Sequence, residues 1–133
     1  MAEFIMKDLL QKSGIPGVTV DSVAATTEEI GHDMYPPARR KLRAMGIPFA
    51  PRHARLITRA DYDMADLIPV MDTENLRHLR RLLGEDNAGK IHLLMDYAGQ
   101  HREVADPWYT GDFDQTYEDI RTGCEGILKG IKS

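Results

Sequence analysis

The stretch Asp66-Leu67-Ile68-Pro69-Val70-Met71 decides the fold class, because it is a short apolar run that leads directly into a helical pattern. Its Ile and Val residues favour a strand. Residues 74–83 carry leucines at helical spacing, with Thr73 as a cap before them and Gly84 after them. A further apolar run at 90–95 predicts the next strand. Strand, helix and strand in this order predict a parallel sheet.

The N-terminal half shows the same alternation of helices and strands. Its first helix has no capping side chain before it, and an apolar, β-rich strand follows. Residues 26–35 are polar and are predicted to form a loop. The predicted elements in this half are a helix at 1–13, a strand at 18–25, a helix at 36–46, and a short helix ending at Ala65 with Thr58 and Asp61 as its capping pair.

The C-terminal part is predicted to be one long amphipathic helix, because apolar residues recur there every three or four positions. Cys124 lies on this apolar stripe, which predicts a buried structural thiol and not a nucleophile. We therefore predict a single α/β domain over residues 1–133, with an open parallel sheet covered by helices on both faces. The beginning departs from this pattern, since such alternation ordinarily opens with a strand and here a helix comes first.

The composition is that of an ordinary globular protein, with 42% hydrophobic and 29% charged residues. A net charge of −4 argues against nonspecific nucleic-acid binding, and the basic cluster Arg39-Arg40-Lys41 with Arg43 is interpreted as a solvated helix face. No apolar run approaches the roughly 18 residues of a membrane span, and no signal-peptide pattern opens the chain. These features predict a cytoplasmic protein with neither a nucleic-acid nor a membrane partner.

The potential metal ligands do not form a recognisable site. The single cysteine excludes an intrachain disulfide and a multi-cysteine metal centre. The five histidines are scattered without the spacing of a metal site. Asp66, Asp72 and Asp96 lie at strand ends, where we expect them to cap helices, and Asp112 is predicted to cap the last helix. The sequence predicts neither a metal nor another cofactor.

The stretch Ala105-Asp106-Pro107-Trp108-Tyr109-Thr110-Gly111-Asp112-Phe113 sets an acid beside two aromatic residues on a loop. Pro107 disfavours a helical conformation for Asp106, so the carboxylate is held on extended chain and is free to point into a cleft. Trp108 and Tyr109 then either pack on the core or line a pocket for a flat ligand. The alternative is an ordinary turn with aromatic side chains tucked beneath it.

Together with the alternation of elements, several segments resemble the low-molecular-weight protein-tyrosine phosphatase family, in its bacterial branch. The resemblance runs over essentially all 133 residues. The segments that carry it are Thr27-Glu28-Glu29-Ile30-Gly31, Tyr35-Pro36-Pro37-Ala38-Arg39-Arg40-Lys41-Leu42, Gly46-Ile47, His53-Ala54-Arg55-Leu56-Ile57-Thr58, Ala65-Asp66-Leu67-Ile68, Met71-Asp72, Asn75-Leu76-Arg77 and Asp106-Pro107-Trp108-Tyr109.

The resemblance implies hydrolysis of a phosphotyrosine protein or a small aryl phosphate through a phosphocysteine intermediate. Asp106 would be the general acid, and Trp108 and Tyr109 would flank the phenyl ring of the substrate. Family members open with a strand and a loop that holds a Cys, five further residues and an Arg, followed by Ser-Pro. This chain begins at Met1-Ala2-Glu3, directly after that point of the pattern. The chain is thus expected to lack the nucleophile, the phosphate-gripping Arg and the first, central strand.

Three interpretations follow from the resemblance. The chain is a phosphatase truncated by a mistaken start site, a natural pseudophosphatase that binds partners, or an arsenate reductase. The last is disfavoured because arsenate reduction relays electrons through extra cysteines, which this sequence lacks. By resemblance the strand order is 2-1-3-4, so loss of the first strand would leave unpaired edges. We therefore expect self-association through those edges, or an unusual closure of the sheet.

Overall fold

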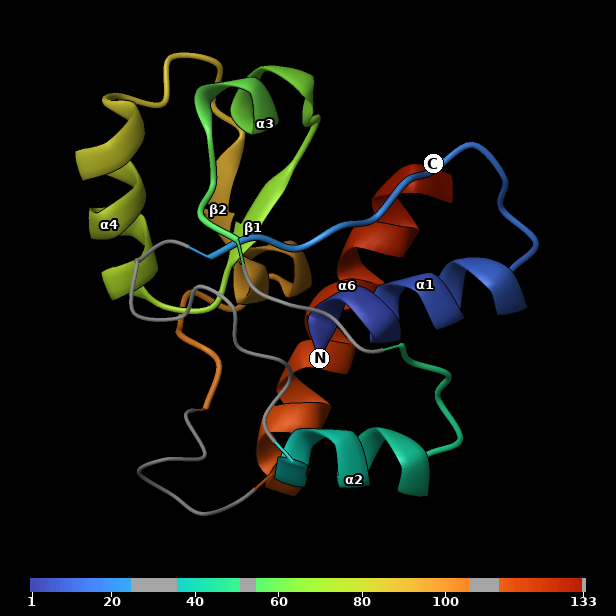
Figure 1. The fold of residues 1–133 in the computed structure, drawn as a ribbon. Helices are drawn as coiled ribbons and strands as arrows, with labels where there is room; N and C mark the ends of the chain where they lie inside the picture. The colour runs from blue at the N-terminus through green and yellow to red at the C-terminus, as the bar shows by residue number, and fades with distance from the viewer. Residues whose placement is uncertain (25–35, 51–54, 106–112, 133) are drawn as a thin grey trace.

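The structure is a computed structural model that describes residues 1–24, 36–50, 55–105 and 113–132 (Figure 1). Short strands lie among a larger set of helices, as an α/β fold requires. In chain order the elements are α1 (Ala2–Lys12), α2 (Pro36–Ala44), α3 (Arg59–Met64), β1 (Ile68–Val70), α4 (Thr73–Leu83), β2 (Ile91–Leu93), the 3-10 helix η2 (Leu94–Ala98) and α6 (Phe113–Lys132).

Strands β1 and β2 pair in parallel, with Ile68 opposite Ile91 and Val70 opposite Leu93. Helix α4 connects them, so the predicted strand–helix–strand unit is confirmed. The four apolar side chains of the two strands pack in one cluster with leucines of α4. In Figure 1, α4 lies on one side of the strand pair, and α1 and α6 lie on the other side. The fold class is therefore α/β with a small parallel sheet and helices on both faces.

All three predicted strands are shorter in the structure. The strand expected at 66–71 is reduced to Ile68–Val70. Of the strand expected at 18–25, the described residues keep a single parallel bridge between Ala24 and Leu56. A strand needs a backbone partner along its length, and the backbone N–H of Ser22 donates instead to the side chain of Asp21, at 2.8 Å. The strand expected at 90–95 ends at Leu93, because the chain turns there into η2.

The helix boundaries follow the predicted caps with one correction. Thr58 and Asp61 form the capping box of α3, with both reciprocal bonds present. Helix α4 starts one residue earlier than predicted, because Asp72 and not Thr73 is the N-cap. The carboxylate of Asp72 accepts the backbone N–H of Asn75 at 2.8 Å. The expected loop at 26–35 and the expected cap Asp112 lie outside the described residues.

The main core lies where α6 packs against α1, α2 and η2. Two glycines of α6 allow η2 to approach closely. A Cβ on Gly123 would lie 2.5 Å from the Cγ of Leu94, and one on Gly126 would collide with the backbone of Tyr97. Substitution of either glycine therefore requires η2 to move away from α6. Across the described residues, every helix is too short or too polar to cross a membrane.

Candidate functional site

Residues 106–112, which hold the predicted acid and aromatic residues, are called the acid loop. The chain that leads to this loop runs along the carboxyl end of β1. The backbone N–H of Val104 donates to the carbonyl of Met71, the residue directly after the strand, at 3.0 Å. In open α/β sheets this end of the strands is where ligands bind. Asp106, Trp108 and Tyr109, the candidate site residues, lie outside the described residues. Both flanks of the loop, Ala105 and Phe113, are described.

Ala105 is held through both of its backbone groups by side chains of α6. Its N–H donates to Oδ2 of Asp119 at 2.9 Å, and its carbonyl accepts the hydroxyl of Thr116 at 2.8 Å. Both Asp119 and Thr116 are buried. The residue immediately before Asp106 is therefore fixed to the long C-terminal helix.

Asp119 is the centre of this attachment and is only 2% exposed. The guanidinium of Arg102 grips it with two bonds, Nη2 to Oδ1 at 2.8 Å and Nη1 to Oδ2 at 3.0 Å. The side-chain amide of Gln115 adds a bond to Oδ1 at 2.8 Å. The Arg102 bonds lower the pKa of Asp119 to about 2, although burial acts in the opposite direction.

A second set of bonds fixes the turn between β1 and α4. The side chain of Asn75 accepts the backbone N–H of Met71 at 3.2 Å, while Asp72 caps the helix as predicted for a strand-end acid. Glu103 accepts both the backbone N–H and the hydroxyl of Thr73, at 3.0 and 2.7 Å, and these bonds lower its pKa. The segment before the acid loop is thus joined to this turn as well as to α6.

This arrangement can be compared with known proteins. The model of the family "Low molecular weight phosphotyrosine protein phosphatase" matches residues 1–133. The chain belongs to this family. It is 37% identical to the low molecular weight protein-tyrosine-phosphatase YfkJ of Bacillus subtilis (strain 168), over 99% of this chain and 86% of that protein.

Solved structures of family members agree with the fold. The crystal structure of YfkJ superposes with a TM-score of 0.90 at 36% identity, covering 98% of this chain and 84% of that one. The crystal structure of DARP, a drosophila arginine phosphatase, gives a TM-score of 0.85 at 28% identity, covering 99% and 88% of the two chains. The predicted family resemblance is therefore confirmed.

Cys124, the single thiol of this family member, lies on the buried face of α6 in the main core. It is 2% exposed, and burial raises its pKa to about 12. Its Sγ lies 4.0 Å from the carbonyl oxygen of Ala2. A thiol with this pKa is almost wholly protonated at neutral pH, and it is inaccessible to a substrate. The predicted structural role of Cys124 is confirmed.

Within the described residues, no group of three or more His, Cys, Asp or Glu side chains is arranged to hold a metal ion. The prediction that Asp96 caps a helix is wrong, because it lies inside η2, whose N-cap Leu93 makes no side-chain bond. Its carboxylate instead accepts from Nδ1 of His101 at 3.3 Å. The described residues around Ala105 therefore hold the chain directly before Asp106.

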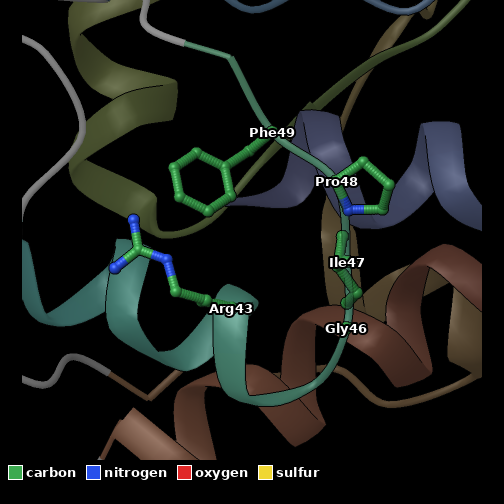
Figure 2. Close-up of a pocket in the computed structure, with 5 residues that line it drawn as sticks. All are labelled: Arg43, Gly46, Ile47, Pro48 and Phe49. Carbon is green, nitrogen blue, oxygen red and sulfur yellow. The ribbon is translucent and has the colours of Figure 1, made fainter.

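Two shallow pockets share Pro48 and Phe49 in their lining. One has a volume of about 490 Å³ and is lined by residues 46–49 and Arg43. Figure 2 shows Arg43 extending from α2 towards the ring of Phe49, and its Cζ lies 5.6 Å from the ring centroid. The other, of about 380 Å³, lies against α1. Neither pocket is lined by the residues that hold Ala105.

The sequence predicts the acid loop but does not reveal the residues that hold Ala105 directly before it. Asp119 and Thr116 precede Gly123 at spacings of four and seven, so all three lie on one face of α6, and that face is buried. An acidic residue on a buried helix face requires a partner. This signal could have marked Asp119, but nothing in the local pattern selects Arg102 as the partner.

Proposed function

We propose that the chain carries the general-acid part of a protein-tyrosine phosphatase site. Asp106 would protonate the leaving phenolate and later activate the water that releases the phosphate. Trp108 and Tyr109 would flank the aryl ring of a phosphotyrosine protein or a small aryl phosphate. One observation carries the proposal: both backbone groups of Ala105 are fixed beside the carboxyl end of β1, directly before the acid.

We further propose that these 133 residues do not turn over aryl phosphates by themselves. The covalent route needs a thiolate beside backbone donors and an Arg that grips the phosphoryl group. Cys124 supports this proposal, because its thiol is buried and has a raised pKa. General acid catalysis is worth roughly 10²–10⁴ in rate and does not replace the covalent step.

The test is the hydrolysis of p-nitrophenyl phosphate by the purified chain under reducing conditions, beside an Asp106→Asn variant. We expect no turnover above the buffer rate from either protein. Turnover that disappears in Asp106→Asn would contradict the proposed inactivity while supporting Asp106 as the acid. Turnover that persists in Asp106→Asn but disappears in Cys124→Ser would contradict both the proposed inactivity and the proposed role of Asp106.

A pseudophosphatase that binds without turnover is the second candidate, and the inert position of Cys124 favours it. Phenyl phosphate and phosphoarginine are the two probes, because one similar solved structure is that of an arginine phosphatase. Saturable quenching of the single tryptophan, Trp108, by phenyl phosphate would support an aryl-phosphate binding module. Absence of binding by both probes would contradict this second function.

We also propose weak self-association through the open edge of β1. The N–H of Ile68 donates to the carbonyl of Lys90, so the groups of Pro69 point away from β2. Within the described residues β1 pairs with β2 alone. Pro69 has no backbone N–H to donate at this edge, and the missing hydrogen bond weakens pairing with another chain. Sedimentation velocity over a concentration series should show dimers that increase in Pro69→Val, and monomers at every concentration in both proteins would contradict the proposal.

A further inference from the structure

We propose that Asp119, together with Arg102, is a positioning residue that sets the direction in which the acid loop leaves the fold. This inference rests on the proposed role of Asp106 and adds to it the side chains that act on that residue through Ala105. Asp119 and Arg102 would not touch the substrate.

Hydrogen-bond donors surround the carboxylate of Asp119. All four groups around its carboxylate are donors: the two Nη atoms of Arg102, the backbone N–H of Ala105 and the amide of Gln115. An ionised carboxylate is acceptor-only and satisfies all of them. An asparagine would turn two hydrogens of its own towards these donors. The site therefore requires an acid and not merely a polar side chain.

Most of the side-chain bonds of Asp119 lead away from its own helix. An aspartate in the interior of a helix is a poor helix former, because its side chain competes for backbone groups. Only the Gln115 bond of Asp119 stays within α6, whereas the Arg102 and Ala105 bonds reach the segment before the acid loop. The side chain of Asp119 thus stabilises that segment more than its own helix.

The carbonyl of the peptide that joins Ala105 to Asp106 is also bonded to α6. This peptide unit is planar, so the carbonyl of Ala105 and the N–H of Asp106 share one plane. Thr116 donates to that carbonyl at 2.8 Å, while Asp119 holds the preceding peptide through the N–H of Ala105. Two consecutive peptide planes are fixed in this way. The starting direction of the acid loop is therefore set by α6.

Trp108 provides a test, because it is the single tryptophan of the chain and lies within the acid loop. The variants are Asp119→Asn, which removes the centre of the attachment, and Thr116→Val, which removes only the bond to the Ala105 carbonyl. Asp61→Asn is the matched control, since Asp61 also accepts two Arg bonds and a backbone N–H, but on α3. The readout is Trp108 fluorescence anisotropy, with circular dichroism to confirm folding.

We expect a lower anisotropy in Asp119→Asn, a smaller decrease in Thr116→Val, and the wild-type value in Asp61→Asn, because loop motion falls in the nanosecond range that fluorescence reports. Unchanged anisotropy in folded Asp119→Asn and Thr116→Val would overturn the inference. If Asp119→Asn does not fold, Thr116→Val decides alone. The readout needs neither ligand nor turnover, so its failure is distinct from a failure of Asp106 as the general acid.

Discussion

Asp61 on α3 and Asp119 on α6 have nearly the same bonding but different surroundings. Asp61 accepts two bonds from Arg55, at 2.7 and 2.9 Å, and the backbone N–H of Thr58 at 2.8 Å. Asp119 accepts two bonds from Arg102 and a backbone N–H at similar lengths. The side chain of Asp61 is 24% exposed and that of Asp119 is 3% exposed.

The difference lies in what each carboxylate holds together. The partners of Asp61 are three and six residues away, so its bonds close the start of its own helix. The partners of Asp119 on the other segment are 14 and 17 residues away. One acid thus stabilises local structure, while the other fastens a separate segment of chain to a helix. The same set of bonds therefore joins two separate segments of the fold only at Asp119.

Asp119→Asn should give the largest loss of stability. The substitution leaves buried donors without an acceptor, and breaking a buried charged pair costs several kcal/mol. Because Arg102 is half exposed and can be rehydrated, we expect a loss of about 3 kcal/mol in the free energy of unfolding. Urea denaturation at neutral pH measures it. A smaller loss in the free energy of unfolding than that of Asp61→Asn would contradict the larger contribution of Asp119.

Acidification should produce the next largest effect. The pKa of Asp119 is about 2 in the folded chain against an ordinary 3.8, so its contribution is present above the ordinary value and is lost as pH falls towards 2. We expect on the order of 2 kcal/mol to be lost over this range. The stability difference between wild type and Asp119→Asn should therefore narrow between pH 5 and pH 2, as followed by urea denaturation at each pH. A difference in the free energy of unfolding that stays constant between pH 5 and pH 2 would contradict the lowered pKa of Asp119.

Asp61→Asn should have a smaller effect, because its pair is partly exposed and the loss is mainly that of a helix cap. We expect about 1 kcal/mol at neutral pH. The pKa of Asp61 is also held well below its ordinary value by Arg55, so this loss likewise diminishes in acid. Thermal unfolding in parallel with Asp119→Asn measures the ratio of the two effects.

The double variant Asp61→Asn/Asp119→Asn provides the finest test of the comparison. Among the described residues the two carboxylates share no hydrogen-bond partner. Their effects on the free energy of unfolding should add to within about 0.5 kcal/mol. A larger coupling, measured by the same denaturation series, would show that the two sites are linked through the core.

The comparison also explains what could be predicted from sequence. The capping box of Thr58 and Asp61 is a signal that spans four residues, and the structure confirms it. The amphipathic pattern of α6 and the burial of Cys124 were likewise predictable from periodicity alone. In each of these cases the determining residues are close together along the chain.

The features that sequence reasoning missed depend on contacts across the fold. Arg102 is one of 17 Lys and Arg residues, and no spacing rule links it to Asp119. The strand expected at 18–25 has the right composition, but the β-bridge found among its described residues joins Ala24 to Leu56. A strand is completed by its neighbours, so β propensity alone overestimated its length. The acid loop itself stays a prediction.

The glycine contacts of α6 have a consequence for which insertions and deletions this helix can accept. Gly123 and Gly126 fit against η2 only at their present positions, so they fix the register of the C-terminal half of the helix. Asp119 lies about one turn before Gly123. One residue inserted between them would rotate Asp119 by about 100° around the helix axis, away from Arg102. A change of length between Asp119 and Gly123 would therefore disrupt either the glycine contacts with η2 or the bonds of Asp119 to Arg102.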